Sequence, residues 1–286
     1  MAEHRLDEPV IGIAFDGTGL GTDGRIWGSE FFVADLNGFE RVSHFDYLPM
    51  PGGDKAVEEP WRMALSCLYR AFGEDLTDLG IPLLKQIGPT KAEWILRMIR
   101  QGVHCPDTCG AGRYFDAVAA LLGLCFTSGY EGEGPMKLEA ITRKGIQDAY
   151  PVQPGPSISF QPAFFEMVAD IRSGTDPGII ATKFHNSIIS AIFETASGIR
   201  REYKLDKVVL SGGVFQNRYL TEHVLKKLKG SQFKVYTHAA APPNDGGIAL
   251  GQLVIAAKRR NNYVFGYTGE SNPRGQWPGS GSDRRD

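Results

Sequence analysis

Cysteine, excess charge and long apolar runs are all scarce in this sequence. Four cysteines in 286 residues are too few for a disulfide scaffold and favour a reduced, cytoplasmic protein. The longest apolar run, residues 117–126, falls well short of the ~20 residues that a membrane helix needs, so we predict no membrane association. Thirty-one basic and 33 acidic residues leave a net charge of −2, which argues against nucleic acid as a partner.

Histidine is also sparse, and no two of the six histidines are spaced i, i+4, which excludes a helix-borne His-x-x-x-His metal site. His185 lies in an apolar helical stretch, where a hydrogen-bonded core histidine is the more common outcome. Cys105 and Cys109, preceded by His104, suggest zinc, but three residues separate them and no second pair follows. Zinc is therefore the weaker interpretation there, and the role of these two cysteines stays open.

Glycine, by contrast, is abundant. It accounts for 35 of 286 residues, about 12% against a usual ~7%, and tight glycine turns are places where ligands reach the backbone. A hydrophobic content of 42% is enough to form a core. At ~150 residues per domain, the length predicts two compact units or one bilobal unit.

Hydrophobic periodicity divides the chain into four parts. They are a β-hairpin unit (1–55), a mostly helical region (56–205), a β-α segment (206–262) and a polar tail (263–286). In the third part, a strand at 207–210 and a helix at 217–229 precede a strand at 233–236 and a helix at 245–258. This alternation predicts an α/β fold with a helix-covered sheet.

Two glycine turns are candidate anion sites because each connects a strand to a helix. Gly212 and Gly213 form the first, and Gly246 and Gly247 the second. Backbone N–H groups and the helix dipole both favour negative charge at such turns, and successive β-α units open on the same edge of a sheet. Taken alone, the Gly212-Gly213 turn is equally consistent with a tight connection that binds nothing.

Two carboxylates accompany these turns. Asp16 follows a predicted strand at 10–15, and Asp245 opens the second glycine turn. Carboxylates in such places suit a hard or borderline cation, whereas the simpler alternatives are a self-closed turn for Asp16 and a helix N-cap for Asp245. Metal sites usually need three or four ligands, and the pattern nominates these two.

Five motifs occur in a fixed order along the chain. They are Ala14-Phe15-Asp16-Gly17-Thr18-Gly19 with Trp27-Gly28-Ser29-Glu30-Phe31; Pro51-Gly52-Gly53-Asp54-Lys55-Ala56 with Glu59-Pro60-Trp61-Arg62; Gly112-Arg113-Tyr114-Phe115-Asp116 with residues 117–123; Leu210-Ser211-Gly212-Gly213-Val214-Phe215-Gln216-Asn217; and Asn244-Asp245-Gly246-Gly247-Ile248 with residues 249–252. In this order they resemble the C-terminal carbamoyltransferase domain of the HypF family, which matures nickel-iron (NiFe) hydrogenases. The resemblance covers about residues 10–257.

The resemblance implies an α/β fold of the actin, sugar kinase and Hsp70 superfamily, similar to the threonylcarbamoyltransferases. That fold has two ribonuclease-H-like lobes, here with added helices and an incomplete N-terminal lobe. The implied reaction transfers a carbamoyl group from carbamoyl-adenylate, made from carbamoyl phosphate and ATP, to the C-terminal Cys of a HypE-like partner. The product is the precursor of the cyanide ligand of the hydrogenase iron.

The resemblance also assigns roles to residues. It implies a divalent metal, whether iron, zinc or magnesium, on Asp16 and Asp245. It places ATP or carbamoyl-adenylate against two further sets. Around its phosphates would lie Gly212, Gly213, Asn217, Asn244, Gly246 and Gly247, and by its ribose Gly112 and Asp116.

The family's His-rich metal segment is expected upstream, because residues 1–4 resemble the end of that helix. The upstream HypF domains are then further expected partners. Whether Met1 is the natural start stays open, as do the activity of this chain alone and its oligomeric state. The alternatives are a truncated, non-catalytic homologue that binds a nucleotide or partner, and, less favoured by the motifs, a sugar-kinase-like phosphotransferase.

Overall fold

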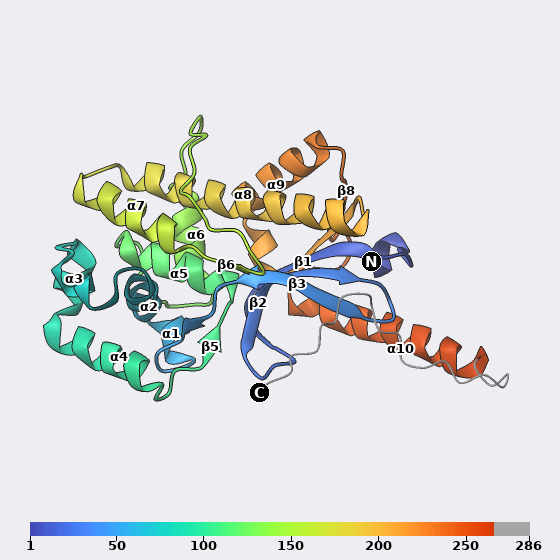
Figure 1. Ribbon diagram of the computed structural model, residues 1–286, viewed down its shortest axis with the longest axis horizontal. Coiled ribbons are helices and arrows are strands. Elements are labelled where there is room, and N and C mark those ends of the chain that lie inside the picture. The colour runs from blue at the N-terminus through green and yellow to red at the C-terminus, as the bar shows by residue number, and fades with distance from the viewer. Residues whose placement is uncertain (266–286) are drawn as a thin grey trace.

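One mixed sheet lies at the centre of the fold. The structure is a computed structural model and describes residues 1–265, so the predicted tail lies outside the described residues from 266 onward. Within that range the sheet has eight strands in the order β4-β5-β2-β1-β7-β8, with β3 beside β2 and β6 beside β3 (Figure 1). The strands are β1 (Val10–Leu20), β2 (Ile26–Ala34), β3 (Phe39–Phe45), β4 (Leu48–Pro49), β5 (Asp107–Thr108), β6 (Ser157–Ile158), β7 (Lys207–Ser211) and β8 (Lys234–Tyr236).

Strand β1 pairs with one strand that is near in the sequence and with another that is far away. It pairs antiparallel with β2 and parallel with β7, from Ile11 beside Val208 to Ala14 beside Ser211, and β8 continues the sheet parallel to β7. Parallel strands flanked by helices are typical of α/β proteins. The predicted α/β class is therefore confirmed.

The structure also shows how residues 1–55 and 206–262 are related. Because β1 and β7 are hydrogen-bonded neighbours, both segments contribute strands to one sheet. Hydrophobic periodicity indicates that a segment is a strand, but it does not indicate which other strand pairs with it. Two parallel strands can be joined by a crossover of any sufficient length, so they can lie far apart in the sequence. Residues 56–205 lie between β4 and β7 in the chain.

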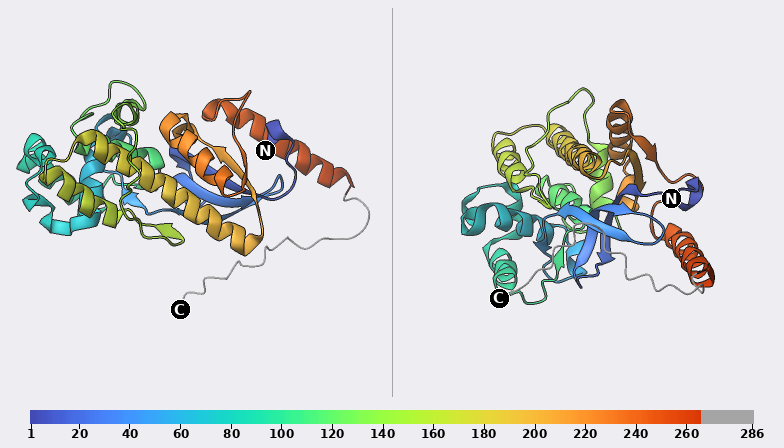
Figure 2. Two further views of the ribbon diagram at one scale, coloured as in Figure 1. Left: turned by 90° about the horizontal axis from the view of Figure 1, so that it is seen from above. Right: turned by 45° about the vertical axis from the view of Figure 1, so that its right-hand side comes forward.

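The helices cover the sheet from two parts of the chain. In Figure 1 the inserted helices lie to the left of the strands, α8 passes above them beside α9, and α10 extends to the lower right; Figure 2 shows α8 and α9 side by side from above. Helices α5 and α8 contact β1. The helices are α1 (Lys55–Glu58), α2 (Trp61–Phe72), α3 (Pro82–Ile87), α4 (Pro89–Gln101), α5 (Ala111–Leu121), α6 (Glu133–Ala140), α7 (Gln161–Arg172), α8 (Pro177–Tyr203), α9 (Arg218–Gly230) and α10 (Ile248–Phe265), with short 3-10 turns η1 (Ala2–His4), η2 (Gly73–Asp78), η3 (Gly213–Gln216) and η4 (Asp245–Gly247).

An aromatic cluster fixes the end of β1. The Phe15 ring centroid lies 5.4 Å from that of Phe31, 5.0 Å from Phe45 and 5.6 Å from Phe215. Phe45 in turn contacts Phe160 at 4.8 Å. Each such pair contributes about 1 kcal/mol beyond simple burial, so the backbone at Phe15 is held from β2, β3 and η3 at once.

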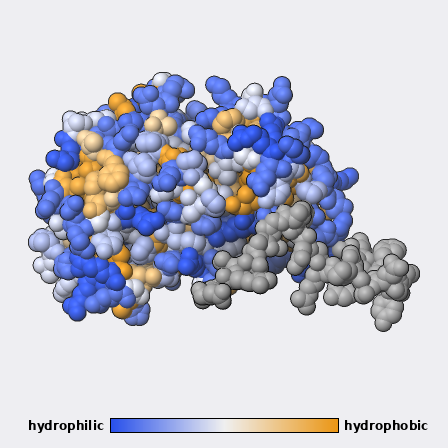
Figure 3. Space-filling view, in the orientation of Figure 1, coloured by the Kyte–Doolittle hydropathy of each residue, from blue (hydrophilic) through white to orange (hydrophobic). Residues whose placement is uncertain are grey.

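The apolar run 117–126 is a core element. Its first half, residues 117–121, lies in α5, where Ala117, Val118 and Leu121 are buried. No helix in residues 1–265 is long and apolar enough to cross a bilayer. The face shown in Figure 3 is mostly hydrophilic, with apolar residues in separate patches.

Asp176 caps the N-terminus of α8. Its carboxylate accepts hydrogen bonds from the N–H groups of Gly178, at 2.9 Å, and Ile179, at 3.2 Å. We expect Asp176→Ala to lower the free energy of unfolding by about 1–2 kcal/mol, because it removes the cap. Urea unfolding checks this, with Asp176→Ser as the control that keeps an acceptor and most of the stability. Equal stability of the alanine variant and the wild type would contradict it.

Candidate functional site

Asp16 lies within β1, which continues to Leu20 and does not end at residue 15 as predicted. It sits in a bulge, where the register with β2 shifts between Phe15 and Gly19. One carboxylate oxygen of Asp16 accepts the N–H of Gly17 at 2.9 Å. The other accepts the N–H of Gly213 at 3.3 Å. Asp16 therefore closes its own turn and also ties β1 to the turn that follows β7.

Glycines let three backbone segments meet at this point. A Cβ on Gly212, whose φ is +102°, would lie 2.0 Å from the carbonyl oxygen of Phe15. A Cβ on Gly110 would lie 2.0 Å from the carbonyl oxygen of Gly17, and one on Gly112 would lie 2.9 Å from the Gly17 Cα. No side chain fits at these three positions. Glycine here serves close backbone approach.

A cleft opens where these segments meet. It consists of two adjoining cavities of about 340 and 360 Å³, bounded by the end of β1, the start of α5, the region of α6, and the turns η3 and η4. Of the residues predicted from the sequence, the first cavity is lined by Asp16, Gly112, Gly213, Asn244, Asp245 and Gly246. The second adds Asn217. Residues from four distant segments thus line one site.

Three predicted residues do not line the cleft. Gly212 lies directly behind it and donates its N–H to the carbonyl oxygen of Pro243 at 2.8 Å. Gly247 lines a different cavity, beneath α10. Asp116 is buried behind Arg113, which does line the cleft.

The N–H groups of the turn glycines already have acceptors within the protein. Gly213 donates to Asp16, Gly246 donates to the side chain of Asn244 at 3.2 Å, and Gly247 donates to the carbonyl oxygen of Asn244 at 2.9 Å. Asn244, and not the exposed Asp245, therefore caps η4. The N-cap alternative for Asp245 is wrong, and its carboxylate is available to the cleft.

Arg113 is the cleft residue that the sequence-based selection missed. Its guanidinium forms an ion pair with Asp116, Nη2 to Oδ2, at 2.8 Å, and both side chains are less than a tenth exposed. Burial raises the pKa of Asp116 to about 6, although Arg113 acts in the opposite direction. The i, i+3 spacing of an Arg and an Asp at a glycine-opened helix start was the available signal.

Asn217 is engaged in supporting the fold next to the cleft. Its side-chain oxygen accepts the N–H of Leu220 at 2.8 Å and so caps α9, while its amide nitrogen lies 3.0 Å from Nε2 of His185. The other ring nitrogen of His185 lies 2.8 Å from the carbonyl oxygen of Ala181 and must donate, because that oxygen can only accept. Burial lowers the pKa of His185 to about 4, so it is a neutral core histidine, as predicted.

The carboxylates of the cleft do not by themselves form a metal centre. Residues 1–265 hold no group of three or more His, Cys, Asp and Glu side chains that could bind an ion. The carboxylate oxygens of Asp16 accept two N–H donors, while the carboxylate of Asp245 accepts no hydrogen bond within residues 1–265, where only its backbone carbonyl accepts, from Ile248. The described donor set falls short of the three or four ligands typical of a resident metal, and metal binding by these two residues remains a prediction.

Cys109 belongs to a buried polar cluster beneath the cleft. Its thiol lies 3.1 Å from Glu30 Oε1, and Arg41 Nη2 lies 3.0 Å from the same carboxylate oxygen. Burial raises the pKa of Cys109 to about 12, so the thiol stays protonated at neutral pH and is a poor nucleophile. Burial likewise raises the pKa of the half-buried Cys105.

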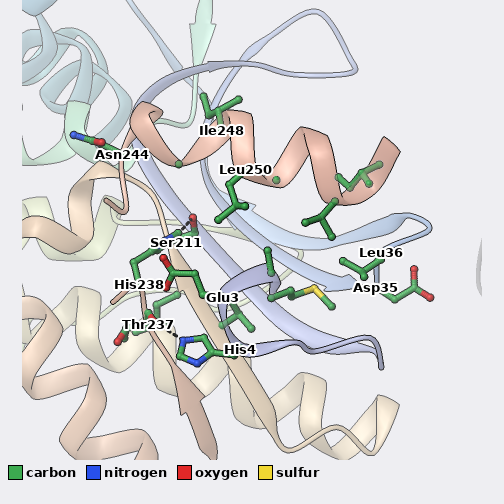
Figure 4. Close-up of a pocket in the computed structure, with 18 residues that line it drawn as sticks. Glu3, His4, Asp35, Leu36, Ser211, Thr237, His238, Asn244, Ile248 and Leu250 are labelled. Carbon is green, nitrogen blue, oxygen red and sulfur yellow. Dashed lines mark hydrogen bonds between the residues drawn. The ribbon is translucent and has the colours of Figure 1, made fainter. Parts of the chain in front are cut away.

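A further cavity lies beside the N-terminus, beneath α10 (Figure 4). In it, Ser211 Oγ lies 3.0 Å from His238 Nε2, and His4 Nε2 lies 2.7 Å from the carbonyl oxygen of Thr237. The carboxylate of Glu3 accepts N–H groups from Ala239 and Ala241. The bonds of Glu3 and His4 attach η1 to the segment after β8.

Comparison with known proteins places this architecture in a family. Residues 12–252 match the family described as "Carbamoyltransferase, Kae1-like Domain, second subdomain". The chain is 32% identical to carbamoyltransferase HypF2 of Cupriavidus necator over 92% of its own length and 35% of that protein. It is also 32% identical to a carbamoyltransferase HypF homolog of the same organism, over 91% of this chain and 68% of the homolog.

The fold agrees with solved structures. A crystal structure of full-length HypF in its phosphate- and nucleotide-bound form matches with a TM-score of 0.84 and 39% identity, over 90% of this chain and 41% of that one. The T. kodakarensis HypF structure matches with a TM-score of 0.82 and 31% identity, over 92% and 36%. The chain spans about a third of the HypF2 protein and corresponds to a second subdomain, consistent with its single sheet. This chain belongs to the HypF carbamoyltransferase family.

Proposed function

We propose that this chain binds a nucleotide in the cleft and serves carbamoyl transfer from carbamoyl-adenylate to the C-terminal Cys thiol of a HypE-like acceptor. The reaction would belong to nickel-iron hydrogenase maturation in the cytoplasm, where the product leads to the cyanide ligand. The observation that carries the proposal is the convergence of Asp16, Gly112, Gly213 and Asn244 on one cleft in a chain of this family. The nucleotide-bound relative supports ATP or carbamoyl-adenylate as the ligand class.

The proposed chemistry is an acyl transfer. The acceptor thiolate attacks the carbamoyl carbon, a C–S bond forms, the bond between that carbon and the phosphate oxygen breaks, and AMP leaves with the electron pair. The thiol proton is released when the thiolate forms. No step requires an oxidant or reductant.

The chain's own residues would hold the donor for this attack. The glycines at 17, 112 and 213 remove side chains from the floor of the cleft, so the phosphate and acyl group can lie against backbone. The two adjoining cavities, about 340 and 360 Å³, are each within the usual range for small-molecule sites. A divalent metal would supply electrophilic assistance if bound, and its remaining ligands would have to come from outside the described donor set.

Titration calorimetry tests the binding half of the proposal. AMP, ATP and a stable carbamoyl-adenylate analogue are titrated into the purified chain with and without Mg²⁺, and into Asp245→Ala. We expect saturable binding by the wild type, with the Mg²⁺-dependent part lost in Asp245→Ala, because Asp245 presents an uncommitted carboxylate to the cleft. Absence of binding by the folded wild type would contradict a nucleotide site in this chain.

Single-turnover mass spectrometry tests the transfer half. Carbamoyl-adenylate, the chain and an acceptor protein with a C-terminal Cys are mixed, and the acceptor is followed for the mass of one carbamoyl group; an acceptor with Ser in place of that Cys is the control. Binding without transfer would favour the second candidate, a non-catalytic nucleotide- or partner-binding homologue. In that case the upstream HypF domains would be needed as partners for transfer.

A further inference from the structure

Arg113 is the one cation among the described residues that line the first cavity. The same cavity carries the carboxylates of Asp16, Glu131 and Asp245. These carboxylates repel a phosphate that enters the cavity, so its binding requires a positive charge close by. The position of Arg113 meets this need.

The guanidinium of Arg113 is also incompletely paired. Its side chain is 7% exposed, and its one ion pair within residues 1–265 is with Asp116 at 2.8 Å. Its Nε is buried with no hydrogen-bond partner there, although an arginine carries five N–H donors. Leaving buried donors unpaired is costly, which indicates that an acceptor from outside the chain completes the set.

Arg41 provides an internal comparison. It is a second mostly buried arginine, 14% exposed, paired with Glu30 at 3.0 Å, and its Nε also lacks a partner in the described range. However, Arg41 Nη1 donates to Tyr47, its Nη2 contacts both Glu30 and Cys109, and it lines neither cavity of the cleft. Within residues 1–265, Arg113 has one ion-pair partner, and it lines the first cavity of the cleft.

Gly17 gives a ligand access to Arg113. A Cβ at position 17 would lie 3.3 Å from Arg113 Nη2 and 3.7 Å from its Cζ. Because residue 17 has no side chain, nothing at that position covers the guanidinium of Arg113. Because the N–H groups of Gly212, Gly213, Gly246 and Gly247 are already bonded within the protein, these turns do not supply the donors that were expected of them.

We propose that Arg113 binds a phosphoryl oxygen of the nucleotide in the cleft, and that Asp116 is the positioning residue that orients its guanidinium. The inference rests on the proposed function and adds to it the contact that distinguishes a nucleotide from a nucleoside. Arginine suits this role because its planar fork matches two phosphate oxygens. Asp116 then acts through Arg113 and not on the ribose.

Calorimetry with adenosine, AMP and ATP tests this on the full chain. We expect the wild type to bind AMP more tightly than adenosine. Arg113→Lys should lower AMP affinity roughly 10- to 100-fold, because the two-pronged contact is lost, while adenosine affinity stays unchanged. Asp116→Asn should give a smaller loss of the same selectivity, and Arg41→Lys, the matched control at the buried pair outside the cleft, should leave both affinities unchanged.

The outcomes separate the inference from the function on which it rests. If the wild type binds neither ligand, the proposed function fails and the inference with it. If the wild type prefers AMP and Arg113→Lys keeps that preference in full, the nucleotide site stands and the role of Arg113 is refuted. Should Arg113→Lys unfold, the double variant Arg113→Met/Asp116→Asn removes both charges of the buried pair, and retained AMP selectivity in this variant would equally refute the role.

Discussion

Alanine at position 212 is expected to lower the free energy of unfolding by about 2–5 kcal/mol and to abolish nucleotide binding. The added Cβ would lie 2.0 Å from the carbonyl oxygen of Phe15 and 2.6 Å from its carbonyl carbon, and the residue would have to keep a φ of +102°. Backbone strain and forced repacking each cost about 1–3 kcal/mol. Relief requires the turn after β7 to move away from β1, which would break the bond between Gly213 and Asp16 on the floor of the cleft.

Urea unfolding and AMP calorimetry measure the two effects together. Gly198→Ala is the matched control, because Gly198 lies within α8 and its added Cβ meets nothing within 4 Å. It should raise stability by up to about 1 kcal/mol, as expected of alanine in a helix interior. If Gly212→Ala retains wild-type stability and affinity, then the contact between β1 and the β7 turn does not shape the site.

Acidification from pH 7 to pH 5 is expected to remove about 2 kcal/mol of stability through His185. The ordinary pKa of histidine is near 6.5, and burial lowers the pKa of His185 to about 4 in the folded protein. Between pH 6.5 and pH 4, His185 is protonated in the unfolded chain but stays neutral in the folded protein. The penalty is therefore absent above pH 7, grows as pH falls below 6.5 and levels off below 4.

Asp116 works in the opposite direction over nearly the same range. Burial raises its pKa to about 6 from an ordinary value of 3.8, so the folded protein binds its proton first, and stability increases as pH falls through 6. We expect this to offset about 1 kcal/mol of the loss at pH 5.

Urea unfolding at both pH values checks the two contributions. Asp116→Asn removes the offset and should steepen the acid loss. His185→Gln leaves only the Asp116 contribution and should turn the loss into a gain of about 1 kcal/mol at pH 5. If neither substitution changes how the free energy of unfolding depends on pH, then His185 and Asp116 do not cause the acid sensitivity.

The local parts of this molecule were predictable because they leave short-range signals. The strand-helix alternation after residue 206 matches β7, α9, β8 and α10, and the glycine turns do face the cleft. β3 went unnoticed because the half-buried stretch Phe39–Phe45 lacks a clear alternation of apolar and polar residues. Hydrophobic patterns of period 2 and 3.6 indicate which side chains are buried, but not which segments pack against each other.

Features that depend on distant contacts could not be predicted in the same way. Gly212 was selected as a donor to phosphate, yet its N–H serves Pro243 and its lack of a side chain serves Phe15. Asp116 was placed at a ribose because it shares a motif with Gly112, yet its carboxylate faces Arg113. In both cases the contacts of the residue depend on a neighbour that is distant in the sequence or on burial in the fold, and one sequence reveals neither.

The position of β7 in the sheet has a consequence for how the protein is made. Strand β1 can pair with β2 soon after both have been synthesised. Its other edge stays unpaired until residues 56–205 and then β7 have been synthesised, at roughly 5–20 residues per second. An unpaired apolar edge is a template for association with other chains, and contacts between residues so distant in sequence form slowly. We therefore expect nascent chains that stop before Lys207 to aggregate, and the native sheet to be completed only after β7 has emerged from the ribosome.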